Sequence, residues 1–368
     1  MNPDAPQENA RDAAQAGIAD ADIPYRGLTP DVVLDALDSV SLRGDGRLIQ
    51  LNSYENRVFQ VFLEDGAVVV AKFYRPGRWS DAQILEEHAF SLALLAQEIP
   101  VVAPLALSSS APCVNTARLI PSDGDTRALL SSSTLASFNT EQGPLRFSVA
   151  PRCSGQAPEL DNDDTLRWIG RFLGRLHAVG KQQPFLHRRV LNVNTVGTAA
   201  RDWLVANHSV PIEVLSTWLI TVDQALAAAQ ALFDEAAPIA TIRLHGDCHP
   251  GNILWAAGGS NAGPHFVDLD DAVQGPAVQD LWMMLSGDAS AMSRQMSVVL
   301  SGYTDFMDFD VRELKLIEAL RTLRMVHHSA WLAQRWNDPA FPIAFPWFGG
   351  VAYWQQQVTQ LGEQLELM

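Results

Sequence analysis

The sequence predicts an α+β fold of two lobes, an antiparallel sheet followed by a mainly helical region. Three short apolar runs follow one another between residues 47 and 74, and polar or turn residues separate them. From Asp163 onward, apolar residues recur at helical spacing over much of the chain. At 368 residues the chain is long enough for two sizeable cores. We therefore expect an N-terminal lobe at 28–150 and a C-terminal lobe at 151–368.

The N-terminal lobe is predicted to begin with a helix after Thr29. Threonine is a favoured N-cap, and Pro30 suits the first helical position. Strands are then predicted at 47–51, 57–63 and 67–74, with a hairpin turn at 64–66, and a helix from about 80 to 97.

Residues 108–145 are rich in Ser, Thr, Ala and Gly, so we expect a long surface excursion there. The run RFSVAPRCSG that follows is predicted to be a strand that enters a hinge between the lobes. Further helices are predicted from 163, at 213–235, at 276–305 and at 311–336.

The composition excludes several classes of protein. A net charge of −16 argues against nucleic-acid binding, which needs a basic surface. No apolar run reaches the length of a membrane span, so no membrane role is expected. Residues 1–27 form an acidic, polar tail without the apolar stretch of a signal peptide, and we expect disorder. Three cysteines give no framework of disulfides, which favours a cytoplasmic location.

The most specific motif is LHGDCHPGNILW followed by FVDLDD. Asn252 follows Asp247 by five residues, the spacing of the H-R-D-x-x-x-x-N catalytic loop of protein kinases, with Gly in place of Arg. Asp268 lies sixteen residues further on, and a short polar loop separates the two apolar runs. This pattern predicts a hairpin with a base at its entry and metal ligands on both arms.

Phosphoryl transfer explains these residue types. Asp247 can orient the attacking hydroxyl and accept its proton, while Asn252 and Asp268 offer the oxygen ligands that Mg²⁺ prefers. The alternative is an ordinary turn followed by a solvated acidic loop, which the complete set at this spacing disfavours. A zinc site at His245, Cys248 and His249 is disfavoured, because no second Cys/His pair lies at ligand spacing.

Lys72 ends the apolar strand VVVAKF, where a lysine can neutralise the α- and β-phosphates of ATP. Glu87 follows on the next predicted helix and could pair with Lys72. We choose it over Glu86 because Phe90 and Leu94 place it on the apolar face. The alternatives are a lysine that only reaches for water and a glutamate on the surface.

Between the first two strands, NSYEN stands where many kinases carry a glycine-rich loop. Ser53 and the loop amides could cradle a phosphate, although an ordinary polar loop would have the same composition. Backbone groups from Val149 to Arg152 are expected to meet the adenine. The pair His327-His328 is expected to be structural, and the C-terminal tryptophans are expected to form core and groove wall, in preference to a cofactor site.

Several long runs resemble the bacterial stress response kinase A family. They include LNSYENRVFQV, VAKFYRPGRWSDAQILEEHAF, RLHGDCHPGNILW, FVDLDDAVQGPAVQDLWMML and DPAFPIAFPWF, and the resemblance extends from about Leu28 to the C-terminus. Members of this family are Ser/Thr protein kinases with a choline-kinase/aminoglycoside-phosphotransferase-like fold. The resemblance implies that Asp247 is catalytic, that Asn252 and Asp268 bind Mg²⁺, and that Ser53 contacts ATP. It also implies a monomeric, cytoplasmic enzyme linked to envelope stress and protection against stress-induced cell death.

The sequence therefore predicts a two-lobed protein-kinase-like fold with ATP and Mg²⁺ between the lobes. Asp247 and Asp268 are the catalytic candidates, and Ser53, Lys72 and Glu87 the nucleotide-binding ones. The expected acceptors are Ser or Thr hydroxyls of protein substrates. One alternative is a small-molecule kinase, because His249 stands where Ser/Thr protein kinases commonly carry Lys. The other is a pseudokinase, against which the complete set of catalytic residues argues.

Overall fold

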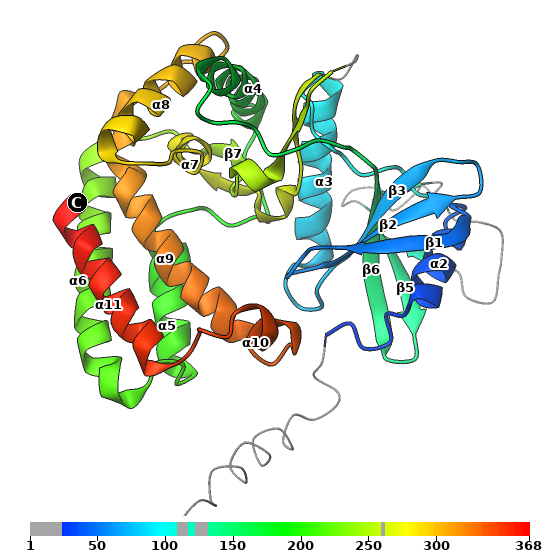
Figure 1. Ribbon diagram of the computed structural model, residues 1–368, viewed down its shortest axis with the longest axis horizontal. Helices are drawn as coiled ribbons and strands as arrows, with labels where there is room; N and C mark the ends of the chain where they lie inside the picture. The colour runs from blue at the N-terminus through cyan, green and yellow to red at the C-terminus, as the bar shows by residue number, and fades with distance from the viewer. Residues whose placement is uncertain (1–23, 109–116, 122–131, 259–261) are drawn as a thin grey trace, which may run out of the picture.

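The computed structural model describes residues 24–108, 117–121, 132–258 and 262–368, which form two lobes (Figure 1). The N-terminal lobe is a six-stranded antiparallel sheet in the order β1-β2-β3-β6-β5-β4. The strands are β1 (Gly44–Leu51), β2 (Arg57–Leu63), β3 (Val68–Phe73), β4 (Arg118–Leu119), β5 (Ala136–Thr140) and β6 (Gly143–Pro151). The expected order of helix, three strands and helix is confirmed.

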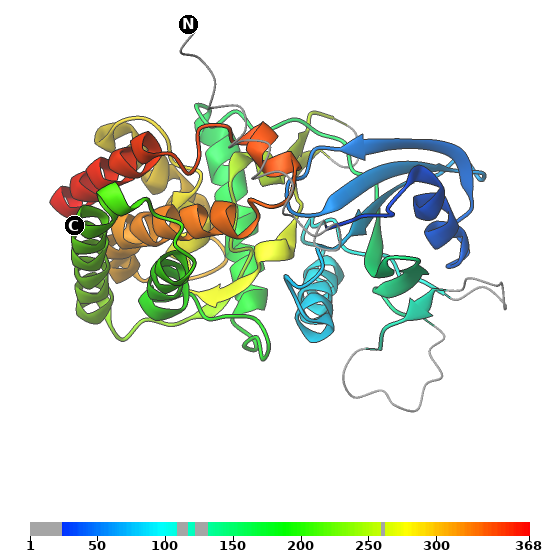
Figure 2. The same ribbon diagram turned by 90° about the horizontal axis from the view of Figure 1, so that it is seen from below.

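Both predicted helices of this lobe begin at the capping residues that the sequence indicates. In α2 (Pro30–Asp38), the Thr29 side chain accepts a hydrogen bond from the backbone N–H of Val32. In α3 (Asp81–Ala96), Ser80 and Gln83 form a capping box. Helix α2 packs on the sheet, whereas α3 lies between the sheet and the C-terminal lobe (Figures 1 and 2).

The prediction for residues 108–145 is wrong for part of this segment. Strands β4 and β5 lie within it and extend the sheet beyond β6. Ala136 and Phe138 are buried, and Ser137 between them is only partly so, which is the alternation of a half-buried strand. Residues 109–116 and 122–131 lie outside the described part of the chain, as do residues 1–23 of the tail predicted to be disordered.

The C-terminal lobe is mainly helical, as predicted. Its helices of eight residues or more are α4 (Asp163–Gly180), α5 (Ala199–Ala206), α6 (Ile212–Ala236), α8 (Ala289–Tyr303), α9 (Ile317–Gln334) and α11 (Val351–Leu367). Its short helical segments are η2 (Val193–Thr198), a π-helix, η3 (Pro250–Asn252), η4 (Leu269–Asp271), α7 (Val278–Trp282), η5 (Val311–Leu316) and α10 (Ala340–Ala344). The helix predicted at 276–305 is two helices, α7 and α8, and 311–336 begins as a 3-10 helix before α9.

Helices α6, α9 and α11 build a core of their own at the far end of this lobe (Figure 1). Trp218 and Trp354 meet there edge to face, with ring centroids 5.5 Å apart, and both are fully buried. By length and composition alone, α6 could cross a membrane; here it packs against α9 and α11 as a core helix does.

Helices α4 and α8 pack backbone against backbone because glycines line their contact. A Cβ at Gly170 would lie 2.1 Å from the carbonyl oxygen of Val299, and one at Gly174 would lie 2.5 Å from that of Tyr303. Gly302 on α8 approaches Arg167 on α4 in the same way. Since a backbone carbonyl cannot move aside as a side chain can, these positions accept no larger residue without separating the helices.

We expect Gly170→Val to destabilise the protein by about 2–4 kcal/mol, because overpacking this contact forces the helices apart. The change is measured as the free energy of unfolding in a urea titration. Gly362→Ala on α11 is the matched control, because a Cβ there meets nothing within 4 Å. The control should be neutral or stabilise slightly, and equal stability of both variants would contradict the packing argument.

Candidate active site

The predicted catalytic hairpin is present in the middle of the C-terminal lobe. Strands β8 (Ile253–Ala256) and β9 (Gly263–Phe266) pair antiparallel, and β7 (Ile242–Leu244) pairs with β10 (Val273–Gly275) beside them. Asp247 lies in the loop after β7, Asn252 directly precedes β8, and Asp268 follows β9. The fold therefore brings the three predicted residues to one end of the two hairpins.

Asp280, at the start of α7, holds the loop that carries Asp247. Its two carboxylate oxygens accept hydrogen bonds from the backbone N–H groups of His245 and Gly246, each at 2.8 Å. His177 Nε2 lies 3.1 Å from the same carboxylate, and both side chains are fully buried. Since backbone and imidazole partners converge on one buried carboxylate, Asp280 fixes the approach of the chain to Asp247.

Gly246 is required by its surroundings. Its φ is +86°, a left-handed conformation that favours glycine. A Cβ at this position would also lie 2.1 Å from the carbonyl oxygen of Asp271. The catalytic loop thus touches the loop after β9 directly, which explains why glycine replaces the arginine of the H-R-D motif.

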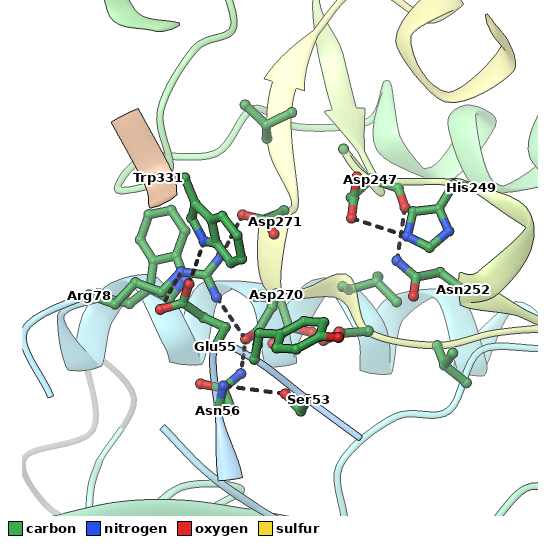
Figure 3. A pocket seen from close by; sticks show the side chains of 18 of the residues that line it. Ser53, Glu55, Asn56, Arg78, Asp247, His249, Asn252, Asp270, Asp271 and Trp331 are labelled. Atoms are coloured by element: carbon green, nitrogen blue, oxygen red, sulfur yellow. Dashed lines mark hydrogen bonds and ion pairs between the residues drawn. The ribbon is translucent and has the colours of Figure 1, made fainter. Parts of the chain in front are cut away.

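Asp247 is paired with a residue that the sequence did not indicate. Arg324 of α9 donates a hydrogen bond to Asp247 Oδ1 at 2.7 Å, and His249 Nε2 lies 3.5 Å from Oδ2. Asn252 donates from its Nδ2 to the backbone oxygen of Asp247 at 2.9 Å, and Figure 3 shows His249 and Asn252 beside the aspartate. Arg324 follows Asp247 by 77 residues, and only the docking of α9 brings the two together.

Asp268 has the geometry of a ligand aimed into the cleft. Its backbone is left-handed, with φ 60° and ψ 61°, which is strained for an aspartate. Its side chain is 50% exposed, the most open of the three aspartates at 268, 270 and 271. Because the amide nitrogen of Asn252 is already engaged, its side-chain oxygen can join an Asp268 oxygen as a metal ligand.

The predicted ion pair between Lys72 and Glu87 is not formed in the described structure. Lys72 Nζ lies 2.9 Å from Asp268 Oδ1 and 3.1 Å from Asp270 Oδ1. Glu87 instead accepts a hydrogen bond from Ser91 at 2.8 Å. Burial by itself lowers the pKa of Lys72, but Asp268 and Asp270 raise it well above its usual value. Burial raises the pKa of Glu87, while Lys72 acts in the opposite direction.

Asp270, which the sequence did not single out, is the buried centre of the site. It accepts hydrogen bonds from Asn56 and Lys72, and Arg78 lies 3.3 Å away (Figure 3). Burial by itself raises the pKa of Asp270, but Lys72 and then Arg78 outweigh it and lower the pKa. Asp270 therefore stays ionised and ties β3 and the loop after β1 to the loop after β9.

The NSYEN loop between β1 and β2 is fastened to the C-terminal lobe. Ser53 Oγ accepts a hydrogen bond from the backbone N–H of Asn56 at 3.3 Å. Glu55 Oε2 accepts from Trp331 Nε1 and from Arg335 Nε, each at 2.6 Å. This loop is held by side chains at the C-terminal end of α9 and directly after it, whereas a glycine-rich loop would be free to flex.

A cleft of about 1210 Å³ lies between the lobes and reaches all these groups. Ser53, Lys72, Glu87, Asp247, Asn252 and Asp268 all line it, as do Ala150, Pro151 and Cys153 at the hinge. His327 and His328 also line the cleft. Their structural role stays a prediction. Both histidines lie on α9 within one turn of Arg324, so the helix that contacts Asp247 also forms a wall of the cleft.

Comparison with known proteins identifies the family. The model of a family described as "Phosphotransferase enzyme family" matches residues 47–317. The chain is 41% identical to stress response kinase A of Escherichia coli strain K12 over 344 residues, which cover 94% of each protein. It is 40% identical, with the same coverage, to a protein of Salmonella typhimurium strain LT2 named serine/threonine protein kinase RdoA.

Solved structures with the same fold are more distant in sequence. An amicoumacin kinase, solved with AMP-PNP and Ca²⁺, gives a TM-score of 0.62 at 18% identity, covering 89% of this chain and 92% of that one. A microcompartment-associated aminopropanol kinase gives 0.60 at 14% identity, with coverage of 92% and 95%. At these identities the likeness concerns the fold, and it confirms the predicted two-lobed, kinase-like architecture.

We expect Asp247→Asn to lower kcat by about 10²–10⁴-fold, because an amide cannot accept the proton of the acceptor hydroxyl. Nucleotide affinity should change little, since Asp247 faces the acceptor. The two quantities are measured by steady-state kinetics and by calorimetry with ATP and Mg²⁺. Turnover near that of the unchanged protein would rule out this residue as the base.

Asp268→Ala and Asp271→Ala should differ in their effect on ATP affinity measured with Mg²⁺. Asp268 is open to the cleft, whereas Asp271 pairs with Arg78 at 2.6 Å and is not free to bind a metal. We expect the first variant to lose at least tenfold in affinity by calorimetry and the second to lose less. Equal losses of affinity in the two variants would mean that Asp268 is the wrong choice of metal ligand.

Proposed function

We propose that this chain, which belongs to the phosphotransferase enzyme family and to that of stress response kinase A, is an ATP- and Mg²⁺-dependent serine/threonine protein kinase acting in a stress response. The observation that carries the proposal is the convergence of Lys72, Asp247, Asn252 and Asp268 on one cleft. A module that only binds nucleotide has no need of a carboxylate held beside the acceptor. The names of the curated relatives supply the acceptor class and the stress role.

The residues of the cleft fit a nucleotide and its metal. Apolar side chains of both lobes line the hinge side and offer flat walls to a purine; they are Leu51, Val58, Val70, Val102, Leu254 and Val267. Asn252 and Asp268 supply oxygen atoms, which suit Mg²⁺ better than softer metals. The bound metal supplies charge neutralisation at the phosphate oxygens. Nucleotides in the solved structures of the amicoumacin kinase and of a spectinomycin phosphotransferase support the same use of this cleft.

The protein side of the reaction is positioning and charge. Asp247 orients the attacking hydroxyl and accepts its proton, and Arg324 holds one of its oxygens. Lys72, at the wall opposite Asp247, meets the phosphates of the nucleotide. Asp280 keeps the catalytic loop in place through two backbone N–H groups. We further propose that the enzyme works as a monomer in the cytoplasm, following the family resemblance.

A small-molecule kinase is the second candidate. Two observations favour it: His249 stands in the place of the lysine of protein kinases, and helices α5 and α9 wall in the acceptor side of the cleft. The solved structures of similar fold include kinases named for small molecules, an antibiotic and an aminopropanol. Those names describe those proteins, and their identity of 14–18% gives them less weight than the curated relatives.

The proposed function is tested with γ-labelled ATP and Mg²⁺, with and without a generic protein acceptor, and with Asp247→Asn as the control. We expect label on protein Ser and Thr, identified by phosphoamino-acid analysis, and none with the variant. Label found only on added small alcohols would select the second candidate. Nucleotide binding without any transfer would overturn the enzymatic proposal.

A further inference from the structure

We propose that the acceptor hydroxyl is carried by an anionic group, a carboxylate or phosphate next to the alcohol, which two arginines of the cleft wall recognise. The inference rests on the proposed function, because it assumes that this cleft binds an acceptor. It concerns the wall beyond Asp247, which is built by the loop after α4, by η2 and α5, and by α9 (Figure 1). This wall contributes arginines and histidines to the cleft but no carboxylate.

Arg189 is the first of the two arginines, and its backbone is fixed on both sides. Its carbonyl oxygen accepts from the backbone N–H of Gln274 at 3.0 Å, and the N–H of Leu191 donates to the oxygen of Gln274 at 2.7 Å. Just before it, Glu86 of α3 accepts hydrogen bonds from the N–H groups of residues 186–188. A side chain on such an anchored segment is positioned before any ligand arrives, which lowers the entropy lost on binding.

The Arg189 guanidinium has no direct anionic partner in the described part of the chain. Its two terminal nitrogens lie 3.4 Å from His327 Nε2. Burial, and then the charge of Arg189, lower the pKa of His327 to about 3, so the imidazole is neutral at physiological pH. The nearby Asp271 is already paired with Arg78 at 2.6 Å. The partly buried guanidinium of Arg189, with only a neutral ring beside it, can therefore still form charge-assisted hydrogen bonds with an anion.

Arg324 is the second arginine, and it stands between this site and the base. It is 46% exposed and pairs with Asp247 through one nitrogen. Positions 324 and 327 are neighbours on one face of α9, so the group that contacts Arg189 lies one turn from Arg324. An anion held by Arg189 and by the open edge of Arg324 would place an adjacent hydroxyl near Asp247.

A cationic acceptor fits this cleft poorly, because the carboxylates that line the cleft are already paired with other groups of the protein. Glu55 pairs with Arg335 and Arg75, Asp247 with Arg324, Asp270 with Lys72, and Asp271 with Arg78. Glu87 accepts a hydrogen bond from Ser91, and Asp268 pairs with Lys72 and is the proposed metal ligand. The floor near Arg189 is apolar, with Val196, Ala199, Ala200, Leu320 and Leu323. An ammonium group there would meet two like charges and no free anion.

The overall charge of the protein makes the site selective at short range. At a net charge of −16, the molecule repels an acidic acceptor at a distance. An acidic acceptor is attracted only inside the cleft, where the nearby charges of Arg189 and Arg324 outweigh the repulsion from the net charge. The preference for an anion should therefore reside in KM and should not reflect fast, steered association.

The test compares acceptors of matched shape and different charge, using γ-labelled ATP and kcat/KM. One set is a serine peptide flanked by Asp and Glu, by Asn and Gln, or by Lys and Arg. The other set is glycerol 3-phosphate against glycerol. We expect the anionic member of at least one set to exceed its neutral counterpart by tenfold or more. The set that shows this preference tells whether the anion belongs to a protein segment or to a free small alcohol.

Arg189→Gln should lower kcat/KM for the preferred anionic acceptor by about tenfold, through KM, and leave the neutral acceptor within about threefold. Arg189→Lys should recover part of the loss, because it keeps the charge. The matched control is Arg201→Gln on α5, which pairs with Asp202 and Asp223 away from the cleft and should change nothing. Thermal melting verifies that each variant is folded.

Two results would overturn the inference while leaving the kinase proposal intact. One is that neither set shows a preference for its anionic member over the neutral one. The other is an unchanged charge preference in Arg189→Gln. If no acceptor receives label, the proposed function fails separately, and fluorescence anisotropy with a labelled acidic peptide decides the inference. Binding that Arg189→Gln abolishes supports it, and absence of binding refutes it.

Discussion

The structure depends most on the buried carboxylate of Asp270. Three side chains of the N-terminal lobe reach it, namely Asn56, Lys72 and Arg78. Arg188, from the segment that leads to the acceptor wall, donates to its backbone oxygen at 2.6 Å. A buried charge is stable only when it is paired and hydrogen-bonded, and removing one partner typically costs about 3–5 kcal/mol. The position of both lobes relative to the loop after β9 thus follows from satisfying the buried carboxylate of Asp270.

A second group of charges fixes the mouth of the cleft. Arg75 pairs with Glu55 at 3.0 Å and with Asp338 at 2.6 Å, and Arg335, directly after α9, pairs with Glu55 as well. Asp338 lies just before α10, which Figure 2 shows next to the N-terminal lobe. These contacts explain how a chain without a glycine-rich loop can still hold its β1–β2 loop over the cleft. The rigidity comes from side chains of the C-terminal lobe, so the two lobes are coupled where nucleotide is expected to bind.

The sequence was sufficient for elements whose causes are local. Capping at Thr29 and Ser80, the strand runs, and the spacing of Asp247, Asn252 and Asp268 depend on near neighbours, and the structure has each of them. Strand β5 was missed because its Ser- and Thr-rich sequence resembles a loop, and only pairing with β6 makes it a strand. Within the acidic run 268–271, composition could not tell which carboxylate is buried, because burial depends on where the other lobe places its cations.

The remaining site residues were beyond sequence reasoning for a similar reason. Arg324 and His327 lie on α9, and their approach to Asp247 and Arg189 depends on how that helix packs in the lobe. The Lys72–Glu87 pair was argued from helix periodicity, which correctly placed Glu87 on the buried face. Periodicity predicts which way a side chain points, but it does not predict which carboxylate will pair with a given cation. Here the loop 268–270 brings the carboxylates of Asp268 and Asp270 to Lys72.

That competition also separates the roles of the acidic residues. Asp270 is fully occupied by partners of the protein itself, so it serves structure and keeps Lys72 in place. Asp268 shares the same lysine but remains half exposed, on a strained backbone that a purely structural residue would not need. The neighbouring acidic residues are therefore not equivalent: the buried one fixes the geometry, and the exposed one is left for the chemistry.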